Sequence, residues 1–149
     1  SVLTGGGGSG GRLFEELRGE RLVYYVFGIE MTGLAPGYFL FLAQTRPETA
    51  DEVVTRIQAN IARVRAEGVP ADELAGAKQK LIAGNALRNT TPGEQAFQAA
   101  LNELYGLGYD YESSFNDRIN RVTSADVQAV VAKYFNNGVV LATQPEASE

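Results

Sequence analysis

The chain has 149 residues, a length typical of one domain, and its 44% hydrophobic residues and mean hydropathy of -0.14 are those of an ordinary globular protein. Its 13 basic and 18 acidic residues give a net charge of -5. The basic residues are scattered and form no stripe that would neutralise phosphates, which argues against nucleic acid as a partner. No apolar run is long enough to span a bilayer.

The sequence contains no cysteine and no histidine. The chain therefore has no disulfide, no thiolate nucleophile and no imidazole base. An ordinary zinc site is excluded as well, because zinc prefers sulfur and imidazole ligands, whereas carboxylates alone suit harder cations. We expect no metal ligand in this chain. If the chain takes part in metal chemistry, another chain or another segment must hold the metal.

The first predicted elements are a short helix and a hairpin. A glycine-rich run at residues 5–11 leads directly into an amphipathic segment that ends near Arg18. Residues 22–31 are dense in aromatic and β-branched side chains and are predicted to form a strand, with one face formed by Tyr25, Phe27, Ile29 and Met31. Residues 32–37 contain the Gly and Pro of a turn, and residues 38–45 are predicted to return as an antiparallel strand.

Helical periodicity and capping signals dominate the rest of the chain. Apolar residues at three- and four-residue spacing, capping boxes at Thr91 and Thr123, and closing glycines mark the helix ends. Helices are expected from Ala50 to Gly68, from Pro70 through Ile82, from Pro92 to Gly106, from Tyr111 to Arg121 and from Thr123 to Tyr134. A last strand is expected at residues 139–143, followed by a polar tail.

Strands and helices that are segregated in this order predict an α+β fold, in which helices cover one face of an antiparallel sheet. No internal linker divides the chain, so residues 1–149 are expected to form a single domain. Three strands are few for that many helices. We therefore expect the sheet to be incomplete, with an N-terminal strand and helix missing from this piece of the protein.

The glycine run has three possible interpretations. A phosphate-binding loop would end in Gly-Lys-Ser/Thr, whereas this run ends in Gly-Arg-Leu and only four residues precede it. An inert linker would precede a fresh domain start, whereas this run continues into RLFEELR. The third interpretation is that the glycines position the short helix that follows them.

Arg18 and Tyr25 are the candidate functional pair. They lie seven positions apart, across a helix end and the start of a strand, and both side chains carry hydrogen-bond donors that do not titrate near neutrality. Such a pair is suited to binding a peptide carbonyl or an oxyanion that forms on it. The alternative is a surface arginine packed over a sheet tyrosine. The acidic pairs in first helical turns are explained by the helix dipole and indicate no acid–base site.

The run LTGGGGSGGRLFEELRGERLVYYVFG resembles the C-terminal half of the pitrilysin and mitochondrial processing peptidase family. The segments TRPETADEVVTRI, ADELAGAKQKLIAG and LYGLGYDYESSFNDRINRVTSADVQAVVAKYF resemble later parts of the same domain, in the same order. The chain departs from the family pattern at Leu22 and Val23, where glycine and leucine are usual, and at Tyr24, where a small residue is usual.

The resemblance implies an enzyme in which two homologous lobes close around an unfolded peptide. One lobe carries an HxxEH zinc motif, and the other contributes an arginine and a tyrosine, which match Arg18 and Tyr25. The glycines Gly5, Gly6, Gly7 and Gly8 match a loop that contacts substrate in some family members. The implied partners are a zinc-binding domain or subunit and a peptide substrate, and the chain alone is expected to be inactive. The alternative is a catalytically silent homologue that serves as a scaffold or assembly subunit.

Overall fold

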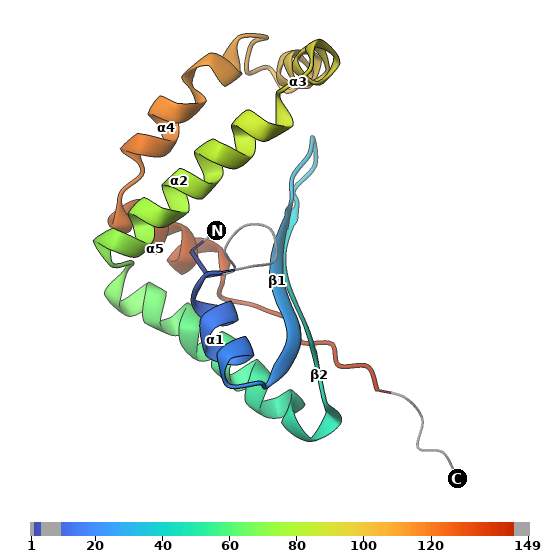
Figure 1. Ribbon diagram of the computed structural model, residues 1–149, viewed down its shortest axis with the longest axis vertical. Coiled ribbons are helices and arrows are strands. Elements are labelled where there is room, and N and C mark those ends of the chain that lie inside the picture. The colour runs from blue at the N-terminus through green and yellow to red at the C-terminus, as the bar shows by residue number, and fades with distance from the viewer. Residues whose placement is uncertain (1, 4–9, 145–149) are drawn as a thin grey trace.

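The computed structural model describes residues 2–3 and 10–144 of the chain (Figure 1). A short π-helical turn, η1, leads into a β-hairpin, which is followed by a 3-10 turn and five α-helices. The elements are η1 (Phe14–Arg18), β1 (Val23–Met31), β2 (Tyr38–Thr45), η2 (Pro47–Thr49), α1 (Ala50–Glu67), α2 (Ala71–Arg88), α3 (Pro92–Leu104), η3 (Tyr111–Ser114), α4 (Phe115–Arg121) and α5 (Ser124–Tyr134).

The hairpin is a long antiparallel pair closed by a loop at residues 32–37. Met31 pairs with Tyr38 at the turn, and the register runs back to Val23 opposite Thr45. Gly37 allows this turn because a Cβ atom at that position would lie 1.6 Å from the carbonyl oxygen of Met31. Any larger residue there would push the two strands apart at the tip.

One face of the hairpin is packed and the other is open. Val23 and Val26 of β1 are buried against η1 and α1, together with Leu13, Leu17 and Val53. A second cluster joins α1 to α5 through Val64, Val69 and Val131. The opposite face of the hairpin, which carries the alternating residues expected from the sequence, is largely exposed. Helices therefore cover one face of the sheet, as the α+β prediction states.

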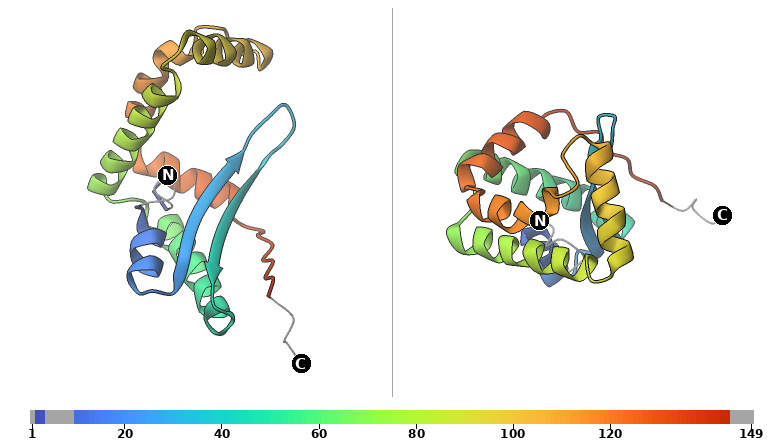
Figure 2. Two further views of the ribbon diagram at one scale, coloured as in Figure 1. Left: turned by 45° about the vertical axis from the view of Figure 1, so that its right-hand side comes forward. Right: turned by 90° about the horizontal axis from the view of Figure 1, so that it is seen from above.

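The hairpin, η1, α1 and α5 form a base, and α2, α3, η3 and α4 form an arm that extends away from it (Figure 2). Helices α2 and α4 lie against each other, and α3 crosses the far end of the arm near η3. The arm contains little core, since Ala77 is the buried residue of α2, Asn102 is the buried residue of α3 and α4 has none.

Two expectations need correction. Residues 139–143 do not form the expected strand: they have no regular secondary structure and are exposed, so the described part of the chain has a two-stranded sheet instead of three strands. A strand needs a neighbour to accept its backbone hydrogen bonds, and residues 139–143 have none in the described part. The helix expected from Tyr111 begins as the 3-10 turn η3 before it continues as α4.

The remaining predicted helices are confirmed, including the capping boxes at Thr91 and Thr123. Each threonine side chain accepts a hydrogen bond from the backbone N–H of the third helical residue, and the carboxylate of that residue accepts one from the threonine backbone N–H. No helix in the described ranges has both the length and the hydropathy needed to cross a membrane.

Candidate functional site

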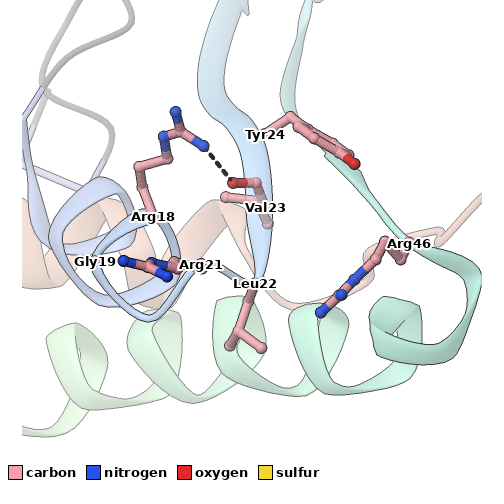
Figure 3. A pocket seen from close by; sticks show the side chains of 7 residues that line it. All are labelled: Arg18, Gly19, Arg21, Leu22, Val23, Tyr24 and Arg46. Carbon is pink, nitrogen blue, oxygen red and sulfur yellow. Dashed lines mark hydrogen bonds between the residues drawn. The ribbon is translucent and has the colours of Figure 1, made fainter.

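An open pocket of about 460 Å³ lies where η1, the start of β1 and the end of β2 meet (Figure 3). Its lining is basic and aromatic and contains no carboxylate. The lining residues are Arg18, Gly19, Arg21, Leu22, Val23, Tyr24 and Arg46. The pocket is thus built from both strand ends of the hairpin and from the turn that precedes it.

Arg18 is held at this pocket by the packing of η1. Leu17, the preceding residue, is fully buried in the cluster beneath the hairpin, so the end of η1 is fixed against β1. The Nη1 atom of Arg18 donates a hydrogen bond to the carbonyl oxygen of Val23 at 3.2 Å (Figure 3). This bond uses one of the five guanidinium N–H donors, and no described residue accepts a hydrogen bond from the other four.

A β-bulge decides which tyrosine lines the pocket. Val23 pairs with Thr45 and Tyr25 pairs with Gln44, so Tyr24 is the extra residue in β1. A bulge bends the strand and changes the direction of the side chains around it. This explains why Val23 and Val26, three positions apart, are both buried on the same side.

Tyr24 is 62% exposed and lines the pocket together with Arg18. Tyr25 is 40% exposed, does not line this pocket, and its ring lies 5.6 Å from that of Phe27, centroid to centroid. Arg18 and Tyr24 therefore line the same pocket from opposite sides of the start of β1, whereas Tyr25 is not among its lining residues (Figure 3). Tyr24 is thus a surface residue and not part of the buried core. The sequence signals the position of Tyr24 at the pocket only by placing two tyrosines next to each other, and this does not predict a bulge.

A polar network below the pocket fixes η1 to α1. Arg56 of α1 donates hydrogen bonds to Glu16 at 3.3 Å, to Glu20 at 3.0 and 3.1 Å, and to Glu52 at 2.9 Å. The buried Asn60 donates a further hydrogen bond to Glu16 at 2.9 Å. These bonds stabilise the carboxylate form of Glu16, so its pKa is lowered, first by Asn60 and also by Arg56.

The described residues do not fit a zinc ion. No group of three or more His, Cys, Asp or Glu side chains gathers anywhere in the described ranges, and the sequence has no His or Cys at all. Carboxylates alone are not the donor set that zinc prefers. The candidate glycines Gly5 to Gly8 lie outside the described residues.

The part of the chain that forms the pocket matches a known protein family. The family model described as the peptidase M16 inactive domain matches residues 2–81, which contain η1, the hairpin and the pocket. The chain belongs to this family. The pitrilysin-like resemblance seen in the sequence is therefore confirmed. The comparison with curated proteins returns no match.

Solved structures show the same fold. A peptidase M16 inactive domain from Pseudomonas fluorescens has a TM-score of 0.79 and 28% identity, and the match covers 91% of this chain and 32% of that one. The inactive peptidase domain of a candidate zinc protease from Bordetella parapertussis has a TM-score of 0.76 and 21% identity, over 99% of this chain and 81% of that one.

A protease from Helicobacter pylori has a TM-score of 0.71 and 21% identity, over 87% of this chain and 32% of that one. This M16 chain thus spans about a third of the length of the Pseudomonas and Helicobacter structures that it matches. At these identities the Bordetella and Helicobacter matches support the fold alone.

Proposed function

We propose that this M16 domain binds unfolded peptides for a zinc metallopeptidase whose zinc site lies on another domain or subunit. The observation that carries the proposal is Arg18, which lies at an open pocket with four guanidinium donors directed to no described residue. The chain contributes hydrogen-bond donors to the peptide and, during hydrolysis, to the developing oxyanion. It contributes no general base and no metal ligand.

Two further facts support the assignment of peptide binding to this chain and of the zinc site to another domain or subunit. The family is described as the inactive domain of M16 peptidases, and the relative from Bordetella is described as the inactive domain of a candidate zinc protease. The donor set of this chain does not suit zinc. A domain of this kind assists peptide hydrolysis by orienting the peptide and by stabilising charge at its carbonyl oxygen.

The tyrosine partner of Arg18 remains a prediction with two candidates. The family motif assigns this role to Tyr25. The bulge instead directs Tyr24 to the pocket, while Tyr25 lies against Phe27. If a bound peptide extends from Arg18 along the open face of the hairpin, it contacts Tyr25. If it enters the pocket, it contacts Tyr24.

The test is peptide hydrolysis by this chain combined with a zinc-binding lobe that carries HxxEH. Arg18→Ala is expected to lower turnover by about 10²–10³, the usual effect of losing one oxyanion donor. Tyr24→Phe and Tyr25→Phe each remove one phenol without changing the ring, so the variant that loses turnover identifies the donor. Tyr109→Phe is the matched control, because Tyr109 is 73% exposed and lies outside the pocket. Unchanged turnover in all three pocket and strand variants would contradict the proposal.

A silent scaffold domain is the second candidate, and one observation favours it. Arg18 donates to the backbone of its own β1, and Tyr25 packs on Phe27, so both side chains also have structural partners. A scaffold domain would bind no peptide, and its Arg18→Ala variant would lose stability without any loss of turnover in the assembled protein. Measuring the free energy of unfolding and turnover on the same variant separates the two functions.

A further inference from the structure

The pocket holds three positive charges that no described carboxylate neutralises. Arg18, Arg21 and Arg46 all line it, and no Asp or Glu residue does. Within residues 2–3 and 10–144, the ion pairs involve only Arg12 and Arg56 as cations. The chain as a whole carries a net charge of -5, so this local excess of positive charge runs against its overall balance.

Two carboxylates that lie close to the pocket arginines in the sequence, Glu16 and Glu20, are bound by other residues. Glu20 directly precedes Arg21, yet it accepts hydrogen bonds from Arg56 at 3.0 and 3.1 Å. Glu16 accepts from Arg56 and from the buried Asn60. Arg56 thus binds Glu16 of η1 and Glu20 of the following turn, and the pocket arginines form no ion pair with any described residue.

Arg21 is held in a backbone conformation that arginine disfavours. Its φ is 59°, and it is the one non-glycine residue in the described ranges with a positive φ. The left-handed conformation costs a side-chain-bearing residue about 1–2 kcal/mol, a cost that glycine avoids. Strain of this kind tends to mark functional positions. Here it places a guanidinium at the pocket.

Arg21 and Arg46 also have unused hydrogen-bonding capacity. Neither side chain makes a hydrogen bond to any described residue, whereas Arg18 makes one. Figure 3 shows Arg18 and Arg21 on one side of the start of β1 and Tyr24 and Arg46 on the other. Planar guanidinium groups bind carboxylates through paired N–H donors, and bonds of this type are among the stronger polar contacts in proteins.

We infer that Arg21, on the same side of β1 as Arg18, forms a subsite for a carboxylate of the bound peptide, and that Arg46 adds positive charge to this pocket from the other side of the strand. This inference rests on the proposed function, because it requires a peptide at Arg18. The carboxylate is either an acidic side chain or the C-terminal group of the peptide. A carboxylate on the peptide is thus expected to strengthen binding, although the net charge of the chain is negative.

The experiment measures binding of short, otherwise identical Gly/Ser peptides to the 149-residue chain by fluorescence anisotropy, with a neutral dye at the N-terminus. One set carries a pair of Glu, one a pair of Gln and one a pair of Lys at the same positions, each with a free or an amidated C-terminus. We expect the Glu peptide to bind about 3–10-fold more tightly than the Gln peptide at low salt, and this preference to shrink at high salt. The net charge of the chain alone predicts the opposite order, with the Lys peptide tightest.

Arg21→Gly and Arg46→Gln are expected to reduce the preference for Glu over Gln without abolishing binding of the Gln peptide. Arg21→Gly suits the left-handed backbone, so its unfolding free energy should not fall and lost binding cannot be attributed to misfolding. Arg88→Gln is the matched control, since Arg88 is exposed at the end of α2 and outside the pocket.

The amidated peptides separate the two sources of the carboxylate. A preference for Glu over Gln that survives amidation assigns the subsite to acidic side chains, whereas equal binding of the Glu and Gln peptides with a loss of affinity on amidation assigns it to the C-terminus. Equal binding of all peptides, with Arg18→Ala still weakening it, overturns the subsite and leaves the proposed function intact. Absence of any peptide binding overturns both.

Discussion

The base and the arm are held together by different kinds of interaction. In the base, η1, the hairpin and α1 share a buried cluster, and a network around Arg56 fixes η1 to α1. In the arm, α2, α3 and α4 bury almost no apolar side chains. These helices are stabilised by a capping box at Thr91 and by local polar contacts. The pocket lies on the base. The site residues are therefore positioned by the more rigid half, and the arm is expected to open more readily.

Truncation of a buried leucine should show the largest difference in stability between the base and the arm. Leu17 is fully buried beneath the pocket, so Leu17→Ala is expected to lower the free energy of unfolding by about 2–5 kcal/mol. Leu87→Ala removes the same atoms from the arm, where the side chain is 74% exposed, and should change it by less than about 0.5 kcal/mol. Urea unfolding measures both. Similar losses for the two variants would show that the arm and base are equally packed.

Acid should loosen the base through Glu16. The pKa of Glu16 is lowered in the folded state by its bonds to Asn60 and Arg56, so its stabilising contribution is complete above the ordinary carboxyl range. That contribution is lost as the pH falls through the lowered pKa. Glu16→Gln should cost about 1–2 kcal/mol at neutral pH, and its deficit relative to the natural chain should shrink in acid.

Urea unfolding over a pH series checks this expectation. Glu15→Gln is the control, because Glu15 is an exposed neighbour on η1 that makes no hydrogen bond or ion pair to a described residue. Glu94 and Asp126 also have lowered pKa values, through their capping threonines, and both variants keep that part of the acid dependence. A deficit that stays constant with pH would contradict the role of the Glu16 carboxylate.

The two capping boxes allow the same bond to be broken in each region. Thr91→Ala and Thr123→Ala each remove a cap worth about 1 kcal/mol. Helix α5 packs on α1 through Val131, so the Thr123 variant should have a free energy of global unfolding that is lower by this amount. The Thr91 variant should mainly speed hydrogen exchange at the start of α3, because that helix opens locally. Equal losses in global unfolding would show that the arm unfolds together with the base.

The sequence predicted the regular elements better than the site. Alternation and capping signals are local, so the hairpin and the helices could be predicted from them. The bulge at Tyr24 and the left-handed Arg21 depend on how β1 packs against η1, which is tertiary information. The strand predicted at residues 139–143 is wrong for a related reason. Its hydrophobic pattern is local, but a strand exists only beside a partner.

A contact within the arm should give the smallest effect. The guanidinium carbon of Arg118 lies 3.5 Å from the ring centroid of Tyr111, which joins α4 to η3. Such a cation–π contact at an exposed site contributes about 0.5–1 kcal/mol. Tyr111→Leu should therefore speed hydrogen exchange across η3 and α4 and leave binding at the base pocket unchanged, whereas Tyr109→Leu should alter neither. A change in peptide affinity on Tyr111→Leu would show that the arm is coupled to the site, and the separation of the two regions would then fail.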